Sequence, residues 1–139
     1  MAKMIFMNLP VTDLPRSLAF YKELGAVQNP QFSDDTAAMV SFSEAINVML
    51  LTHDKFRMFT DKAIGDPHTA VQVLLALGLD SREAVDEVTE KALAAGGREV
   101  HPPEDHGWMY SRAFEDPDGH GWGPMWMDAA AAAEAMANC

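Results

Sequence analysis

The chain of 139 residues carries 10 Lys plus Arg and 21 Asp plus Glu, so its formal charge at pH 7 is 10 − 21 = −11. That charge repels phosphate backbones and anionic lipids, which argues against nucleic acid and membrane as partners. The only cysteine is Cys139, so an intramolecular disulfide and a Cys-based zinc site both lack the residues they need. The length fits one domain, and the shortness of every apolar run predicts a soluble, cytoplasmic protein.

The first half of the chain predicts a strand, a helix and three more strands. Residues 4–9 are apolar and compatible with a strand, and Asp13 is placed to cap a helix whose apolar residues recur at helical spacing. Gly25 is expected to end this helix, because glycine readily adopts the positive φ of a helix terminus. The three further strands are expected at residues 28–32, 38–42 and 46–52.

The second half repeats this order. A strand is expected at residues 69–79, the run from Asp80 to Glu83 resembles a capping box, and Gly96 follows the helix. Further strands are expected at residues 98–101, 108–115 and 121–127. The cap-like residues are 80 − 13 = 67 positions apart and the terminating glycines 96 − 25 = 71, so the second helix is about one turn longer. We infer an internal duplication of a βαβββ unit.

These elements set the predicted domain boundaries. A single domain is expected at residues 1–128, with module 1 at residues 3–53 and module 2 at residues 68–128. Residues 54–67 are interpreted as a linker with a short helix. The Ala-rich tail, residues 129–139, is compatible with either a helix or disorder.

The most informative segment is FEDPDGHGWGPMWMD, residues 114–128. Asp116 to Gly119 has the composition of a tight turn, because Pro fixes φ and Gly accepts positive φ. The strand after it contains Gly121 and Gly123, which give up side-chain packing and often mark a place where a ligand comes close. Alternation turns the two tryptophans of this strand to the opposite face, where we expect core. We therefore expect a hollow above the two glycines.

Three segments, LPVTDLPRSLAFYKELGA, LDSREAVDEVTEKALAAGG and FEDPDGHGWGPMWMD, carry a family resemblance over almost the whole chain. Together they resemble the glyoxalase, bleomycin-resistance and extradiol-dioxygenase superfamily, also called vicinal oxygen chelate proteins. The resemblance implies an α+β fold of two tandem βαβββ modules, whose mixed sheet curls around a cleft that dimerisation often completes. It therefore implies a homodimer with a small-molecule ligand.

Catalytic members of that superfamily hold a divalent metal with His, Glu or Gln on the first and fourth strands of each module. The resemblance places these positions at Phe6, Met49 or Leu50, Leu74 and Gly123. Sites for hard metals need imidazole, carboxylate or thiolate donors, which none of these residues provides. We expect no metal and no other cofactor there.

The cleft is expected to receive side chains from both modules. With the simple hairpin register, Arg112 lies across from Gly123, and Tyr110 and Phe114 share the face of Arg112. The guanidinium of Arg112 then contacts either an anionic group of the ligand or a nearby carboxylate of the protein. If the pairing of this hairpin is shifted by one residue, the opposite face of the strand at residues 108–115 points into the cleft instead. The predicted cleft residues are Phe6, Asn8, Leu50, Gln72, Leu74, Tyr110, Arg112, Phe114, Gly121, Gly123 and Met125.

Three functions remain open at this point. The leading hypothesis is binding of a small organic molecule without a catalytic metal, in the manner of the bleomycin-resistance branch. The alternative is a lyase or isomerase of the glyoxalase kind, using a relocated metal or acid–base chemistry by His106, Tyr110 and Glu104, because a loop can bring a general base to its proton. The third is a scaffold whose cleft is filled by its own side chains. The lost metal positions argue against a dioxygenase.

Overall fold

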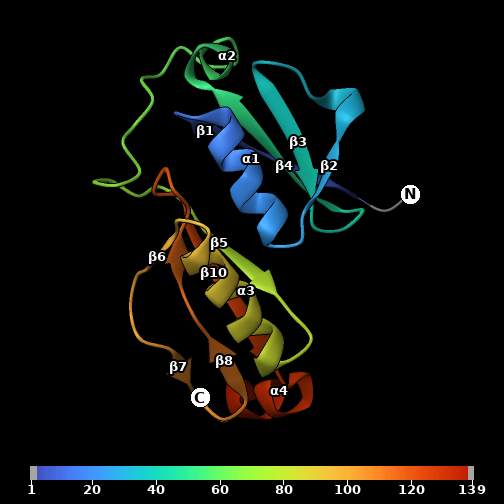
Figure 1. The fold of residues 1–139 in the computed structure, drawn as a ribbon. Helices are drawn as coiled ribbons and strands as arrows, with labels where there is room; N and C mark the ends of the chain where they lie inside the picture. Colours follow the sequence, from blue (N-terminus) through green and yellow to red (C-terminus); the bar gives the residue numbers. More distant parts are fainter. Residues whose placement is uncertain (1–2, 138–139) are drawn as a thin grey trace. The chain divides into compact units, whose positions relative to one another are not determined.

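A computed structural model describes residues 3–137, which form two compact units (Figure 1). Unit 1 holds the described residues up to Ala70 together with Pro117–His120, and unit 2 holds Val71–Asp116 and the described residues from Gly121 onward. The elements of unit 1 are β1 (Ile5–Val11), α1 (Leu14–Glu23), β2 (Val27–Asn29), a 3-10 turn (Pro30–Phe32), β3 (Ala37–Ser41), β4 (Ile46–Thr52) and α2 (His53–Arg57). The elements of unit 2 are β5 (Leu74–Gly78), α3 (Arg82–Ala94), β6 (Arg98–Glu99), β7 (Glu104–Asp105), β8 (Met109–Ser111), β9 (Phe114–Glu115), β10 (Gly121–Met127) and α4 (Ala129–Ala137).

Each unit contains a mixed sheet with one helix packed on it. In unit 1 the strand order is β1-β4-β3-β2, with β1 parallel to β4 and the other pairs antiparallel. In unit 2 β5 is parallel to β10, while β6 to β9 supply the antiparallel strands. The predicted α+β class with two βαβββ modules is therefore confirmed, and Figure 1 shows α1 and α3 lying across their respective sheets.

The core of unit 1 forms between α1 and the sheet. Phe20 of α1 is 1% exposed and packs edge-on against Tyr21, with ring centroids 5.1 Å apart. Val48 and Leu50 of β4 are fully buried, and they pair in register with Met7 and Leu9 of β1. Since successive strand residues face opposite sides, these odd positions of β1 form the face that α1 covers, and the even positions form the open face.

Both long helices begin and end where local chemistry predicts. Asp13 caps α1 by accepting a hydrogen bond from the backbone N–H of Arg16, and Gly25 follows the helix with φ of 97°. Ser81, rather than Asp80, caps α3, and a glycine with φ of 106° follows it. The two helices have 10 and 13 residues, so the second is longer by about one turn, as the spacing of the caps and glycines predicts.

The strands of module 2 are shorter than predicted. β5 covers five residues instead of residues 69–79, and the expected strand at residues 108–115 is divided into β8 and β9. Pro124 of β10 lies opposite the break, where Arg112 donates its N–H to the Pro124 carbonyl at 3.1 Å. Proline has no N–H to return, so the ladder loses a bond there. The two-residue strand β7 lies in a segment that we expected to be a loop.

The turn at Asp116–Gly119 belongs to unit 1 from Pro117 onward, although unit 2 strands flank it. The carboxylate of Asp118, which is 5% exposed, accepts hydrogen bonds from the backbone N–H and the hydroxyl of Thr12 and from the buried hydroxyl of Ser17. Gly119 has φ of 95°, and a Cβ there would lie 2.8 Å from the backbone nitrogen of His68. Glycine is therefore required both by the backbone conformation and by the close packing of the linker.

Two further observations concern the ends of the chain and the length of its helices. The tail is helical over Ala129–Ala137, while Cys139 lies outside the described residues. Within the described part of the chain, no helix has the length and apolar character needed to cross a membrane.

Candidate ligand-binding site

The strand β10 presents two different faces. Trp122 is 4% exposed and lies on the face toward α3, which confirms its predicted place in the core. Gly121 and Gly123 lie on the opposite face, and in register beside them on β5 are Leu74 and Ala76. Leu74 is 77% exposed, so the open face of the sheet carries an exposed apolar side chain on the edge strand β5.

A hollow of about 330 Å³ lies on this open face, and we call it the β10 groove. Its apolar lining includes Leu74, Ala76, Val100, Met109, Ala113 and Met125, and its polar lining includes His101, Glu104 and Ser111. Gly121 and Gly123 also line it. A largely apolar hollow with a few polar groups is typical of a site for a small organic molecule.

The two glycines of the β10 groove have different surroundings. A Cβ at Gly121 would lie 2.9 Å from Cδ2 of Leu74, so the neighbouring side chain uses the space that this glycine leaves. A Cβ at Gly123 would have only one neighbour within 4 Å, the carbonyl oxygen of Arg112 at 3.8 Å. The space above Gly123 is therefore open to another molecule, whereas the space above Gly121 is partly filled.

The side chain of Arg112 lies on the other face, contrary to the simple hairpin register. Glu115 pairs with Gly121, so the loop contains the five residues 116–120, and the same register sets Arg112 beside Pro124 instead of Gly123. The odd-numbered loop shifts the register by one residue and exchanges the two faces. Arg112, Tyr110 and Phe114 therefore direct their side chains toward α3, although Arg112 and Phe114 still border the β10 groove.

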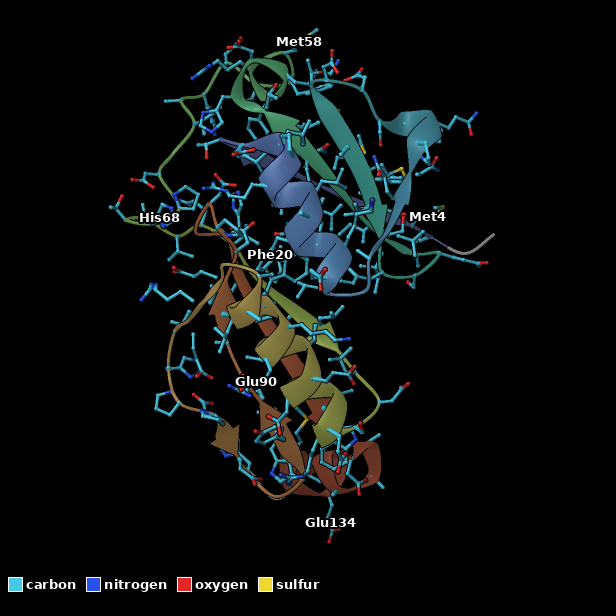
Figure 2. All side chains as sticks on the ribbon, viewed as in Figure 1. Met4, Phe20, Met58, His68, Glu90 and Glu134 are labelled. Atoms are coloured by element: carbon cyan, nitrogen blue, oxygen red, sulfur yellow. The ribbon has the colours of Figure 1, made fainter. Side chains whose placement is uncertain are left out.

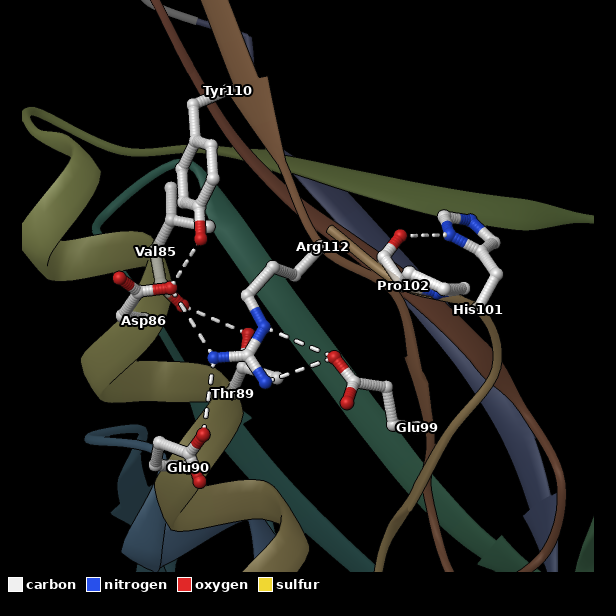
Figure 3. Close-up of polar contacts among 9 residues, drawn as sticks. All are labelled: Val85, Asp86, Thr89, Glu90, Glu99, His101, Pro102, Tyr110 and Arg112. Atoms are coloured by element: carbon white, nitrogen blue, oxygen red, sulfur yellow. Dashed lines mark hydrogen bonds and ion pairs between the residues drawn. The ribbon is translucent and has the colours of Figure 1, made fainter. Parts of the chain in front are cut away.

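Arg112 is 8% exposed and is held by three carboxylates (Figure 3). It pairs with Asp86 at 3.2 Å, Glu90 at 3.1 Å and Glu99 at 2.8 Å. Burial lowers the pKa of Arg112, but its hydrogen bonds to Glu99, Glu90 and Asp86 outweigh this effect and leave the pKa above its ordinary value. The guanidinium is thus fully engaged within the protein and joins α3 to β6.

Tyr110 is held by the same cluster. Its hydroxyl donates to Asp86 at 2.6 Å, and this hydrogen bond, together with burial, raises the pKa of Tyr110 above its ordinary value. Arg82 lies over the rings of both Tyr110 and Trp126, at 5.2 Å from each centroid, and pairs with Asp105 at 2.8 Å. A raised pKa disfavours the tyrosinate, so Tyr110 is poorly suited to act as a general base.

The other two candidates for catalysis are Glu104, in β7, and His106, in the turn between β7 and β8. Glu104 lines the β10 groove, and its carboxylate is 3.8 Å from Nε2 of His106. Both side chains are about half exposed. Among residues 3–137, no group of three or more His, Cys, Asp or Glu is placed to hold a metal ion. The structure therefore brings Glu104 to the groove and separates it from Tyr110, which faces α3.

The predicted cleft residues of module 1 lie in unit 1. Phe6 and Asn8 are on the open face of β1, where Asn8 pairs with Met49. Leu50 was predicted to line the cleft, but it pairs with Leu9 and is fully buried on the face that α1 covers. Of the two alternatives that the resemblance gave, Met49 is therefore the residue on the open face. Gln72 is exposed ahead of β5.

Among the residues of the β10 groove, sequence reasoning did not place Ala76, Val100 and His101, and it offered Met109, Ser111 and Ala113 only as an alternative register. Three of them, at positions 109, 111 and 113, are the residues that a one-residue slip turns inward. Pro124 marks the irregular point of the hairpin, because proline cannot complete a ladder pair, but it does not by itself fix the register. His101 carried no such signal.

Comparison with known proteins gives the family. The profile described as the Glyoxalase/Bleomycin resistance protein/Dioxygenase superfamily matches residues 3–123. The chain belongs to this superfamily. The match runs from β1 through the turn at Asp116–Gly119 to the first residues of β10. No curated protein matches the sequence.

Several solved structures share the fold of this chain. The chain is similar to hypothetical protein SA1046 from S. aureus, with 27% identity, a TM-score of 0.76 and coverage of 91% of this chain and 94% of that one. It is similar to a bleomycin resistance determinant encoded on the transposon Tn5, with 23% identity, a TM-score of 0.64 and coverage of 91% and 99%. It is also similar to the fosfomycin resistance protein FosX from Listeria monocytogenes, with 20% identity, a TM-score of 0.67 and coverage of 94% and 97%.

Proposed function

We propose that this superfamily member binds a small organic molecule in the β10 groove, without the metal that catalytic relatives use. The observation that carries the proposal is the open space above Gly123, in a hollow of about 330 Å³. Apolar walls supply most of the binding free energy, since each Å² of buried apolar surface contributes about 25 cal/mol. Ser111, His101 and Glu104 orient the ligand through hydrogen bonds.

The residues at the family's metal positions support a metal-free site. Phe6, Met49, Leu74 and Gly123 offer no imidazole, carboxylate or thiolate. By analogy with the bleomycin resistance determinant, we propose that the ligand is sequestered and not converted. A carboxylate at the groove favours a ligand that carries a hydrogen-bond donor.

Two measurements test this proposal. Elemental analysis after dialysis is expected to find no stoichiometric metal in the purified protein. A thermal-shift screen of small organic molecules is expected to find compounds that raise the melting temperature, because a ligand that binds only the folded state stabilises it. Stoichiometric bound metal, or a screen in which no compound changes the melting temperature, would count against sequestration.

An enzyme is the second candidate, and Glu104 is the observation that favours it. This carboxylate borders the β10 groove and lies 3.8 Å from His106, so an acid–base pair is available to a bound substrate. Turnover of a compound found in the screen, lost on Glu104→Gln while binding persists, would establish a lyase or isomerase instead.

We also propose that the protein is a cytoplasmic homodimer. Ile5 and Phe6 on β1, Leu74 on β5 and Val73 just before β5 are about half exposed or more, and both strands lie at a sheet edge. Exposed apolar sheet edges favour association with another chain. Light scattering at micromolar concentration is expected to give about twice the chain mass of 15.2 kDa, and a monomer mass would refute this.

A further inference from the structure

A second hollow lies within unit 1 and shares no residue with the β10 groove. Its volume is about 230 Å³. It forms where β1 ends, α1 and α2 begin, and the linker meets the turn at Asp116–Gly119. All residues that line it belong to unit 1. Five separate stretches of the chain thus meet at one small polar hollow.

Three basic side chains line this hollow, and they have donors to spare. Arg16 uses one nitrogen to donate to the hydroxyl of Thr12 at 3.1 Å, and its side chain is 47% exposed. His53 begins α2, and Figure 2 shows His68 on the linker. Within residues 3–137, neither imidazole ring takes part in a hydrogen bond or ion pair. The hollow therefore has more donors than the protein itself uses.

The two acidic residues of the hollow are already engaged. Asp118 accepts three hydrogen bonds from Thr12 and Ser17, and one oxygen of Asp66 accepts the backbone N–H of His68 at 2.9 Å. Asp118 also pairs with the guanidinium of Arg16 at 3.6 Å, through the same nitrogen that donates to Thr12, so the other guanidinium nitrogens and the two imidazoles remain available to a ligand. The described residues here do not form a group able to hold a metal ion.

We propose that this hollow binds a small oxyanion, either a carboxylate or a phosphate group, through Arg16, His53 and His68. A guanidinium presents several N–H donors in the fixed geometry that matches the oxygens of such groups, and charge-assisted hydrogen bonds are stronger than neutral ones. The net charge of −11 opposes anion binding to the protein in general, so these local donors have to supply the attraction. The bound anion thereby connects the linker and the turn with the first residues of α1.

The test is titration of the full-length protein with inorganic phosphate and, separately, with acetate. Binding is followed by the imidazole resonances of uniformly labelled protein and by the melting temperature. Saturable binding that shifts the resonances of His53 and His68 is expected for at least one anion. The anion that binds more tightly shows whether the hollow prefers a phosphate group or a carboxylate. Arg16→Gln and His53→Gln are each expected to weaken binding about tenfold, the loss of one charge-assisted hydrogen bond.

Arg57→Gln is the matched control, because Arg57 is an exposed arginine of unit 1 that pairs with Asp54 and does not line the hollow. It is expected to leave the affinity within about twofold, since solvent screens charges at a distance. Arg16→Lys keeps the charge and is expected to restore part of the affinity. Absence of saturable binding of both anions, or equal weakening by Arg57→Gln and Arg16→Gln, would overturn the proposal.

Discussion

Replacing Gly123 by leucine is the sharpest test of the β10 groove. The only atom within 4 Å of an added Cβ is the Arg112 carbonyl oxygen at 3.8 Å, so the new side chain enters open space instead of the core. If leucine denies a ligand about 100 Å² of apolar contact, at about 25 cal/mol per Å², the loss is about 2.5 kcal/mol. Affinity is then expected to fall by about 60-fold.

The stability of the Gly123→Leu variant is expected to change little. Glycine in a strand is destabilising by roughly 0.5–1 kcal/mol, so its replacement stabilises slightly if nothing clashes. For a chain of this size that corresponds to a rise of about 2–4 °C in melting temperature. Binding of the neutral dye Nile red, followed by fluorescence, and displacement of the dye by compounds from the screen measure the affinity.

Gly78→Leu is the matched control for this variant. Gly78 lies on the same face of the sheet, and a Cβ there would also meet no atom within 4 Å, but Gly78 does not line the β10 groove. The control is expected to retain dye binding and to melt at a similar temperature. Equal loss of binding in both variants, or unfolding caused by Gly123→Leu alone, would refute the reasoning, because the glycine would then serve packing.

Two further predictions concern the polar contacts of unit 2. Arg112→Met leaves three carboxylates without their partner, but their side chains are 31–64% exposed and can be hydrated. We therefore expect the free energy of unfolding to fall by about 2 kcal/mol, which lies between the values for surface and buried ion pairs. Urea unfolding measures it against Arg57→Met, and equal stability of the two variants would refute it. The Asp105 carboxyl is expected to titrate with a pKa of about 2, because it accepts hydrogen bonds from Arg82 and from a backbone N–H. As this pKa lies below the unfolded value of about 3.9, Asp105 stabilises the fold above about pH 4 and this contribution is lost as the pH falls toward 2. Carboxyl NMR titration checks it, Arg82→Gln should raise the pKa, and an Asp105 pKa near 4 in the unmodified protein would contradict it.

The order of the secondary structure could be predicted from the sequence because it depends on local signals. Asp13 and Gly25 set the bounds of α1 through the cap and the positive φ, and β4 and β10 have the predicted bounds of residues 46–52 and 121–127. Each of these signals acts within a few residues. The repeated order of these elements then gave two modules, in agreement with the family resemblance.

The direction of side chains across the last hairpin could not be predicted with the same success. It depends on whether the loop has an even or an odd number of residues, and the five-residue loop 116–120 is stabilised by contacts with residues far away in sequence. Asp118 bonds to Thr12, and Gly119 packs on His68. No local pattern contains this information, so Arg112 was assigned to the wrong face.

The bonds of Asp118 also bear on the order of events during synthesis of the chain. Its carboxylate joins Ser17 and Thr12 across separations of 101 and 106 residues. At about 5–20 residues per second, a ribosome needs roughly 5–20 s to make the chain between these partners. During that interval the hydroxyl of Ser17, which is fully buried in the finished protein, has to be satisfied by water. The N-terminal module therefore cannot reach its final state first, and a nascent chain that stops before residue 118 exposes this helix start to chaperones and proteases.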